Sequence, residues 1–496
     1  MTVAISHRIN GKPWAGTASR HGDVFDPATG AVTGRVDLAS SDVVDEAVAA
    51  AVAVASEWGS SSLARRAAVL FEFRRLMADH AADVAAIVCS EHGKVRDDAM
   101  GEVARGLDVV DFACGIPTLL KGGYSENVST NVDTFSIQQP LGVVAGITPF
   151  NFPVMVPLWM FPIAVAAGNA FVLKPSERDP SAANFLAELM EEAGLPPGVL
   201  NVVHGDKEAV TRLVEHPDVA AVSFVGSTPV ARFVYETATR HGKRAQALGG
   251  AKNHMVVLPD ADMELAADAI VSAAYGSSGE RCMAVSVVVA VGRAGDEVVA
   301  RVRERAAALT VGSADAEGSD MGPLITREHR DRVESYIEAA TEEGAAVVLD
   351  GRRHPVHGDP GGFWTGPSLV DGVTPDMSVY RDEIFGPVLS VARVGTYDEA
   401  VALVNRNPYG NGAAIFTNDG RAARRFQHEV LAGMVGINVA IPVPVSHYSF
   451  GGWKSSLFGD SHIYGADGVR FYTRTKVVTA RWSDPGGVHL GFPPNM

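Results

Sequence analysis

The stretch "VAAVSFVGSTPVA", residues 219–231, decides the fold class of this chain of 496 residues. Its first half is a short apolar run rich in β-branched residues, which is typical of a buried strand. A Gly-Ser-Thr turn follows and leads into a helical pattern that is opened by Pro229. Similar apolar runs that alternate with helical stretches occupy residues 141–147, 169–174 and 198–203. This alternation predicts a parallel sheet covered by helices on both faces, as in nucleotide-binding α/β domains.

A second alternation of apolar and helical stretches begins near Met255 and continues to about residue 440, so we expect two α/β domains. Residues 126–140 and 469–482 alternate polar and apolar side chains, which predicts exposed strands. Because an exposed strand edge needs a partner, these two segments predict an oligomer.

The composition argues against several classes of protein. The formal net charge of −16 repels polyanions and opposes general nucleic-acid binding. The three cysteines are too few and too scattered for a disulfide framework, and no Cys/His spacing predicts a metal site. The N-terminal residues lack the long apolar core of a secretory signal, so we expect a protein of the reducing cytoplasm.

One apolar stretch, residues 152–168, has the composition of a membrane span. It carries prolines at 153, 157 and 162, and it is shorter than the roughly 20 residues that a spanning helix needs. We therefore expect a buried connector and helix here, and no membrane association.

Two loops carry groups suited to a dinucleotide. The loop within residues 223–231 lies between a strand and a helix, where free N–H groups bind phosphate. In "LKPSER", residues 173–178, Lys174 and Glu177 are placed to reach a ribose, and Glu177 would repel a 2′-phosphate, which favours NAD over NADP. The glycine pattern is not GxGxxG, so each loop taken alone fits an ordinary turn equally well.

The stretch "SSGERCMAV", residues 277–285, contains a candidate nucleophile, Cys282. Arg281 supplies positive charge beside the thiol, and the amide of Asn151 in "PFNFP" is a candidate oxyanion donor. Taken alone, a single cysteine is more often a small core residue than a nucleophile.

Six motifs considered together resemble the aldehyde dehydrogenase superfamily in their order and spacing, and the resemblance covers nearly the whole chain. They are "TPFNFP" (148–153), "LKPSE" (173–177), "FVGST" (224–228), "LGG" (248–250), "GERC" (279–282) and "EIFGPVL" (383–389). Agreement of six motifs is far more specific than any one of them, and it makes Cys282 the expected nucleophile.

The resemblance implies an α/β fold in three parts. A Rossmann-like NAD-binding domain with a five-stranded sheet is expected over residues 1–125 and 141–255, and a catalytic domain over 256–440. A β-strand oligomerisation flap is expected over 126–140 and 469–496, with residues 441–468 returning to the NAD-binding domain. A homotetramer is the implied assembly.

The resemblance also implies the roles of individual residues. Cys282 attacks the aldehyde, and the Asn151 amide and the Cys282 backbone N–H form the oxyanion hole. The residues implied to bind NAD are Thr148, Phe150, Lys174, Glu177, Arg178, Gly226, Ser227 and Gly249, together with Glu383 and Phe385 at the nicotinamide ribose.

The chain departs from hydrolytic members of the family at Ala247, where they carry the glutamate that activates water. Alanine has no group that accepts a proton. Another carboxylate, Glu280, remains a possible substitute that spacing does not place. Without a base, the thioester on Cys282 should persist until a better nucleophile arrives, and coenzyme A supplies one.

Further stretches, among them "GAKNH", "GERCMA" and "GWKSS", resemble the CoA-acylating branch that oxidises methylmalonate and malonate semialdehydes. The resemblance implies propionyl-CoA and acetyl-CoA as products, with loss of the carboxylate. Arg105 and Arg281 match the arginine positions of this branch, and an arginine fork binds carboxylate in a fixed geometry. We therefore expect these two residues to clamp the substrate carboxylate.

Two alternatives stay open. The chain is alternatively a hydrolytic or broad short-chain semialdehyde dehydrogenase, or a binding protein that keeps the fold without catalysis. No phosphate-binding motif separate from the NAD elements is visible, so the sequence does not locate a CoA site.

Overall fold

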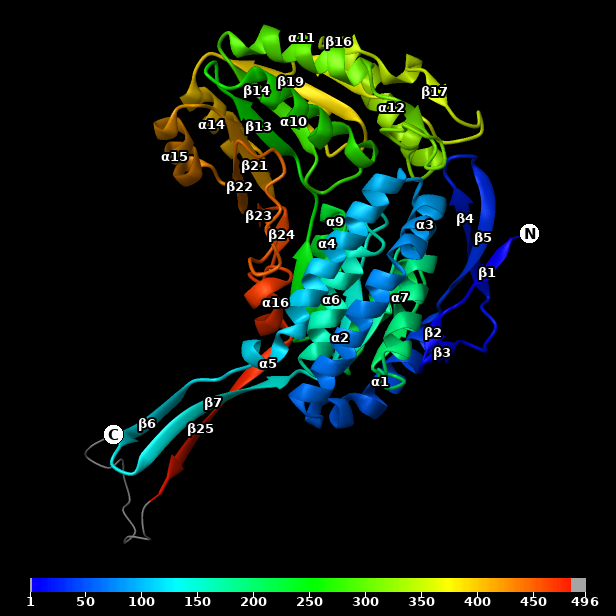
Figure 1. Cartoon of the computed structure of the whole chain (residues 1–496), viewed down its shortest axis with the longest axis vertical. Coiled ribbons are helices and arrows are strands. Elements are labelled where there is room, and N and C mark those ends of the chain that lie inside the picture. The colour runs from blue at the N-terminus through cyan, green and yellow to red at the C-terminus, as the bar shows by residue number, and fades with distance from the viewer. Residues whose placement is uncertain (1, 483–496) are drawn as a thin grey trace.

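The structure is a computed structural model that describes residues 2–482. Two large sheets, each covered by helices on both faces, form the body, and a three-stranded ribbon projects from it (Figure 1). The part of the expected flap beyond residue 482 lies outside the described residues.

The first sheet has eight strands in the order β24-β12-β11-β8-β9-β10-β2-β3. Its parallel centre consists of β12 (Arg244–Leu248), β11 (Val219–Val225), β8 (Val143–Ile147), β9 (Ala170–Lys174) and β10 (Leu200–Val202). Antiparallel strands extend both edges, namely β24 (Leu457–Phe458) on one side and β2 (Arg8–Ile9) with β3 (Lys12–Pro13) on the other. The five strands implied by the family resemblance are therefore the parallel centre of a wider sheet.

Helices cover both faces of this sheet. One face packs on α1 (Ser41–Ser60), α8 (Lys207–Glu215) and α9 (Thr228–Arg240). The other packs on α2 (Leu63–Asp79), α3 (Ala81–His92), α4 (Arg96–Cys114), α6 (Met155–Ala166) and α7 (Ser181–Glu192).

Helix α6 is the apolar stretch identified in the sequence. Every one of its residues is buried, because it lies between the first sheet and the helices α2, α4 and α16 (Gly465–Phe471), and this confirms the expected buried helix. Within residues 2–482, no helix combines the length and apolar character that crossing a membrane requires.

The second sheet has seven strands in the order β16-β18-β19-β14-β13-β21-β22. These are β16 (Ala346–Leu349), β18 (Ser368–Asp371), β19 (Val388–Val394), β14 (Val285–Val291), β13 (Asn253–Val257), β21 (Gly412–Phe416) and β22 (Met434–Ile437). Helices α10 (Met263–Tyr275) and α11 (Ala294–Ala307) cover one face. Helices α12 (Arg327–Glu342), α14 (Tyr397–Arg406) and α15 (Gly420–Glu429) cover the other.

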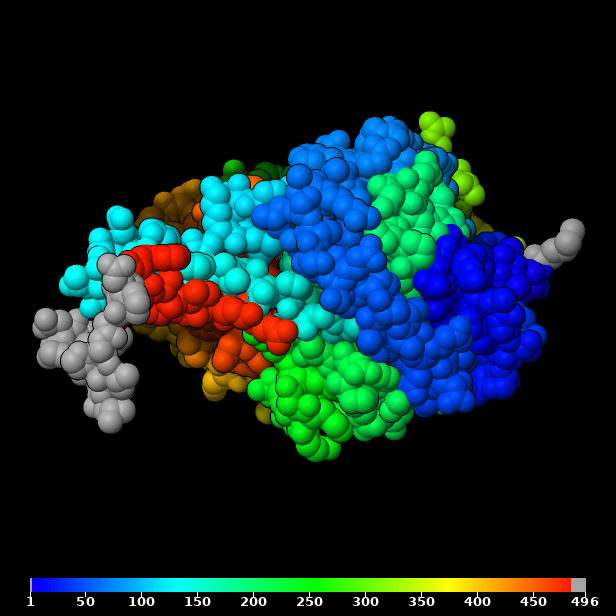
Figure 2. All heavy atoms as spheres, turned by 90° about the horizontal axis from the view of Figure 1, so that it is seen from below, coloured from blue at the N-terminus to red at the C-terminus, as the bar shows by residue number. Residues whose placement is uncertain are grey.

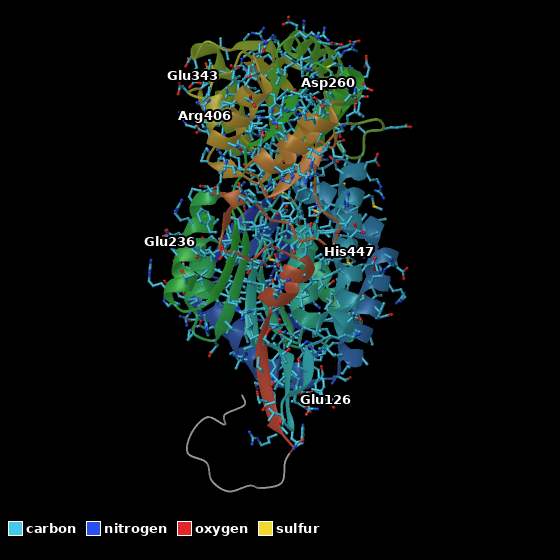
Figure 3. All side chains as sticks on the ribbon, turned by 90° about the vertical axis from the view of Figure 1, so that its left-hand side faces the viewer. Glu126, Glu236, Asp260, Glu343, Arg406 and His447 are labelled. Carbon is cyan, nitrogen blue, oxygen red and sulfur yellow. The ribbon has the colours of Figure 1, made fainter. Side chains whose placement is uncertain are left out.

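The projecting ribbon pairs β25 (Thr473–Arg481) with β7 (Val132–Pro140) and β7 with β6 (Tyr124–Ser129). Seen from below, β25 lies along the β6–β7 hairpin (Figure 2). Residues 469–471, expected to start the last strand, instead end helix α16 (Gly465–Phe471), where Val469 and Phe471 pack into the core below the first sheet. In Figure 3, Glu126 marks the ribbon at one end of the molecule, and Asp260, Glu343 and Arg406 mark the second sheet at the other.

Smaller elements complete the chain. A three-stranded sheet near the N-terminus pairs β1 (Val3–Ile5), β5 (Ala31–Leu38) and β4 (Arg20–Asp26), and two-stranded pairs join β15 (Val311–Gly312) to β17 (Val356–His357) and β20 (Tyr409–Gly410) to β23 (Trp453–Lys454). Short helices occupy α5 (Ile116–Leu119) and α13 (Ser378–Arg381), and 3₁₀ turns occupy Gly276–Gly279 and Gly351–Arg353.

Candidate active site

A cavity of about 730 Å³ is lined by loops and helices that flank both large sheets. Its wall brings together most of the side chains expected from the sequence, namely Phe150, Asn151, Arg178, Gly226, Ser227, Gly249, Cys282, Glu383 and Phe385. Residues that lie more than 230 positions apart in the chain therefore share one concave site. A large cavity with a few converging polar groups is the usual form of an active site.

Cys282 sits on a loop with an unusual backbone. Ser277, Ser278 and Gly279 have positive φ angles of 47°, 55° and 71°. The carbonyl of Cys282 accepts hydrogen bonds from the side-chain amides of Asn253 at 2.9 Å and Asn411 at 3.0 Å. These two amides fix the peptide that carries the thiol.

Burial raises the pKa of the Cys282 thiol to about 12, and the Glu383 carboxylate adds to this shift. The backbone N–H groups of Cys282 and Met283 and the charge of Arg281 lower the pKa, but their effect is smaller. The thiol is therefore protonated at neutral pH. Arg281 thus acts on the thiol in the expected direction, but burial outweighs its effect.

Asn151 is buried in the turn between β8 and α6. Its carbonyl accepts a hydrogen bond from Nζ of Lys94 at 2.6 Å, and the same ammonium lies 2.5 Å from Oε2 of Glu102. Both side chains of this ion pair are fully buried. Glu102 Oε1 also accepts the N–H groups of Val154 at 2.8 Å and Met155 at 3.1 Å. The pair thus ties the Asn151 turn to the start of α6, where a carboxylate complements the helix dipole.

The dinucleotide side of the cavity is formed at the N-terminus of α9. Ser227 precedes this helix without a side-chain cap hydrogen bond, and Pro229 lies in its first turn. The first N–H groups of the helix are therefore free to bind an anion. A Cβ on Gly249 would lie 2.7 Å from the Ser455 carbonyl, so close packing there depends on glycine. This end of the cavity suits a pyrophosphate.

Three expected NAD residues lie together at the strand ends beside the cavity. Nζ of Lys174 is 2.9 Å from Oε2 of Glu177, and the Thr148 N–H donates to the Lys174 carbonyl at 3.1 Å. The hydroxyl of Thr148 is buried and has no hydrogen-bond partner among residues 2–482. A ligand hydroxyl would satisfy it, so these residues fit the sugar of a dinucleotide.

At the other end of the cavity, Phe385 has a positive φ of 61°. Its carbonyl lies 2.7 Å from Nε2 of His329, and its ring meets the Phe150 ring edge-on at a centroid distance of 5.9 Å. The Arg178 guanidinium lies 5.3 Å from the centroid of the Phe150 ring. A strained backbone held by such contacts is typical of a functional site.

The two arginines expected to bind substrate lie in different places. Arg105, on α4, lines a small hollow with Trp159, Ser446 and Tyr464. Burial raises the pKa of Tyr464 and so does the Cys282 thiolate, whereas Arg105 lowers it. Arg105 and Cys282 therefore both lie near the phenol of Tyr464.

Arg281 does not face the large cavity. Its Nη2 lies 2.5 Å from Oδ1 of Asp98, and its side chain lines a separate hollow with Tyr275, Arg305 and Asp320. The structure does not bring Arg281 and Arg105 into one clamp, because Asp98 already occupies the Arg281 fork. A joint role of the two arginines stays a prediction.

Neither position 247 nor Glu280 supplies a base that could activate water in the cavity. Ala247 is fully buried at the end of β12, in register with Phe224 of β11. Glu280 is also fully buried, with Oε1 accepting the Ile325 N–H at 3.3 Å, and burial raises the pKa of its carboxyl well above the usual range. It is not among the described residues that line the cavity, so a role for Glu280 in activating water there is not supported.

Sequence reasoning missed several residues of this site. His329 and Arg332 reach the cavity from one face of α12, and their spacing of three on a helix was the available signal. Lys94 and Glu102 gave no signal, because charged residues in a helical pattern usually indicate a solvated face.

Comparison with known proteins agrees with this geometry. The family model "Aldehyde dehydrogenase family" matches residues 14–478. The chain therefore belongs to the aldehyde dehydrogenase family. The chain is therefore an oxidoreductase of this family, as the motifs predicted.

Individual relatives indicate a narrower group within the aldehyde dehydrogenase family. A malonate-semialdehyde dehydrogenase of Pseudomonas aeruginosa is 53% identical over 479 residues, which cover 96% of each chain. A solved methylmalonate-semialdehyde dehydrogenase of Oceanimonas doudoroffii has a TM-score of 0.96 and 53% identity, covering 98% of this chain and 99% of that one. A third structure, from Sinorhizobium meliloti, carries the same assignment and is complexed with NAD, with a TM-score of 0.96, 51% identity, and coverage of 98% and 99%.

Proposed function

We propose that the protein oxidises methylmalonate semialdehyde and malonate semialdehyde with NAD, and transfers the acyl product to coenzyme A with loss of the carboxylate. The observations that carry the proposal are the pairing of Cys282 and Asn151 in one cavity and the alanine at position 247, which cannot act as a base. The names of the relatives support the semialdehyde substrates. The free N–H groups of α9 and the unpartnered Thr148 hydroxyl support NAD.

In the first chemical step, the Cys282 thiol loses its proton to solvent and the thiolate attacks the aldehyde carbon. The Asn151 amide and the Cys282 N–H stabilise the oxyanion that forms, and fixed donors of this kind contribute about 3 kcal/mol each. NAD, when bound, supplies the hydride acceptor that turns the thiohemiacetal into a thioester. The buried Lys94–Glu102 pair keeps the Asn151 turn rigid during this step.

The thioester of a malonate-type substrate carries a carboxylate β to its carbonyl. Loss of CO₂ from it leaves an enolate, whose negative oxygen the same two donors stabilise. Protonation of the enolate gives the propionyl or acetyl thioester on Cys282. Position 247 supplies no base for water, so we expect the thiol of CoA to release this thioester.

CoA dependence tests the proposal. Purified enzyme mixed with methylmalonate semialdehyde and NAD should give a burst of NADH of one equivalent per active site, and sustained turnover only when CoA is added. The product should be propionyl-CoA. Sustained release of free acid without CoA would show a hydrolytic enzyme instead.

We assign carboxylate binding first to Arg105. The proximity of Arg105 and Cys282 to Tyr464 supports this, whereas the Asp98 pair restrains Arg281. Replacing Arg105 by Met should lower kcat/KM for malonate semialdehyde by roughly 100-fold, since charged hydrogen bonds contribute about 1.5–3 kcal/mol. The kcat/KM for propionaldehyde, which has no carboxylate, should stay within a few-fold of wild type. Arg281→Met should lower kcat/KM for both substrates together. The opposite pattern would make Arg281 the carboxylate ligand.

We further propose that the ribbon joins subunits into a homotetramer. Its exposed apolar side chains include Tyr124, Val477 and Trp482, with 65%, 64% and 71% of their surfaces accessible. An unpaired apolar edge of this kind favours association. Val477→Glu should reduce the mass measured by light scattering, and an unchanged mass would place the interface elsewhere.

A further inference from the structure

Transfer of an acyl group to CoA raises a chemical difficulty. The attacking species is the thiolate, and an ordinary thiol with a pKa of about 8.5 is only a few per cent ionised at pH 7. A base beside Cys282 would remove this limit. Neither Ala247 nor the enclosed Glu280 provides one, but another carboxylate, that of Glu383, lines the cavity.

Glu383 follows α13 and lines the same cavity as Cys282. Its Oε1 accepts the Ala251 N–H at 2.8 Å, which fixes the side chain. A Cβ added to Gly250 would lie 2.3 Å from Oε2, so the second oxygen lies over a residue that has no side chain to cover it. One oxygen is thus used for anchoring, and the other remains for a proton.

The groups around Glu383 set its basicity. Lys252 and Arg332 face it with positive charge, while the Cys282 thiol and the Tyr409 phenol are the acids beside it. Burial raises the pKa of Glu383 to about 6, against the lowering by the Ala251 N–H and by the two cations. The side chain is therefore ionised at pH 7 and more basic than an exposed glutamate.

Lys252 acts on Glu383 through its charge and does not form an ion pair with it. Its Nζ donates to the carbonyls of Val379 at 2.9 Å and Asp382 at 2.7 Å, in the segment that leads to Glu383. Among residues 2–482, no cation lies within ion-pair distance of the Glu383 carboxylate, whose Oε1 accepts only the Ala251 N–H. The second oxygen of this carboxylate therefore stays open to a proton donor that enters the cavity.

We propose that Glu383 is the catalytic base for acyl transfer to CoA. As the CoA sulfur bonds to the thioester carbonyl carbon, its proton passes to the Glu383 carboxylate. The tetrahedral oxyanion then collapses, the bond between that carbon and Sγ of Cys282 breaks, and the departing thiolate recovers the proton from Glu383. No oxidant is consumed. This step rests on the proposed transfer to CoA, and it gives Glu383 a role separate from the ribose contact implied by the family resemblance.

The test uses an acyl-enzyme prepared without NAD, so that any effect on cofactor binding does not enter. The full-length enzyme is acylated with p-nitrophenyl propionate, mixed with CoA, and assayed for propionyl-CoA between pH 5 and 9. In the wild type, the transfer rate should rise through pH 6 and then level. Glu383→Gln should lower it roughly 100-fold at pH 7, a usual size for general-base catalysis, and its rate should instead follow ionisation of the CoA thiol.

A second readout separates chemistry from structural damage. Removing the Glu383 charge should lower the pKa of Cys282, so alkylation of Cys282 by iodoacetamide should become faster in Glu383→Gln while acyl transfer becomes slower. Glu328→Gln, which removes an exposed carboxylate at the cavity mouth, is the matched control and should behave as wild type in both assays.

Two results would overturn the inference in distinguishable ways. If Glu383→Gln transfers its acyl group within twofold of wild type with the same pH profile, Glu383 is not the base, and the proposed function stands. If the wild-type acyl-enzyme releases propionate and makes no propionyl-CoA, transfer to CoA itself is wrong, and the role of Glu383 is wrong with it.

Discussion

Asp98 binds the guanidinium of Arg281, with 2.5 Å between Oδ1 and Nη2. The other carboxylate oxygen of Asp98 accepts the N–H of Ser277 at 2.8 Å and its hydroxyl at 3.0 Å. Positive φ angles such as those of Ser277 and Ser278 cost about 1–3 kcal/mol each. One carboxylate from α4 therefore holds the strained loop that leads to Cys282.

We expect Asp98→Asn to loosen this loop. The substitution keeps the shape and removes the charge, so it should destabilise the protein by about 1–3 kcal/mol and lower kcat. Urea unfolding and NADH formation measure the two effects. Asp97→Asn changes an exposed neighbour on the same helix and should change neither. Equal behaviour of the two variants would contradict the role of Asp98.

The buried Lys94–Glu102 pair predicts a non-additive pair of substitutions. Lys94→Met leaves the Glu102 carboxylate buried without its cation, which should cost about 3–5 kcal/mol. Adding Glu102→Gln removes the stranded charge and should recover at least 1 kcal/mol, because the amide oxygen still accepts from Val154. Urea denaturation of the single and double variants measures the difference. A double variant that is less stable than the single one would argue against a charge pair.

The raised pKa of Cys282 predicts how its reactivity depends on pH. Burial raises the pKa to about 12, so the thiolate fraction should increase about tenfold per pH unit throughout pH 7 to 9 in the absence of NAD. The rate of inactivation by iodoacetamide should follow it without a plateau. Burial also raises the pKa of Cys89 and Cys114 to about 11, and a Cys282→Ser protein supplies the background labelling. A plateau below pH 8 would show an activated thiol.

Position 247 should control which nucleophile releases the acyl group. Ala247→Glu introduces a general base where hydrolytic relatives in the family carry one, and it should raise CoA-independent release of free acid by roughly 100-fold. Ala247→Gln has a similar volume and no base, so it should remain dependent on CoA. Steady-state NADH formation without CoA measures both, with circular dichroism to confirm folding. The same gain in both variants would exclude base catalysis as its cause.

Much of the fold could be predicted from local pattern. The run at residues 219–225 is strand β11, and the helical pattern at 263–275 is helix α10, because apolar periodicity is set by which face of each element is buried. The end of the chain was harder to predict. Residues 469–471 alternate like a strand but finish α16, since Val469 and Phe471 are buried by packing below the first sheet.

The sequence by itself determined the family, through the order of its motifs. It also showed that position 247 is an alanine and carries no base. Only the tertiary structure decided what surrounds the reacting groups. Arg281 is the chain neighbour of Cys282, yet its guanidinium binds Asp98 of α4, which also holds Ser277 of the preceding loop. The basicity of Glu383 likewise depends on burial and on Lys252 and Arg332, which are brought to it from distant parts of the chain. The sequence shows which groups are present and how they are spaced. The direction in which a side chain points, and its removal from water, are set only when the chain packs.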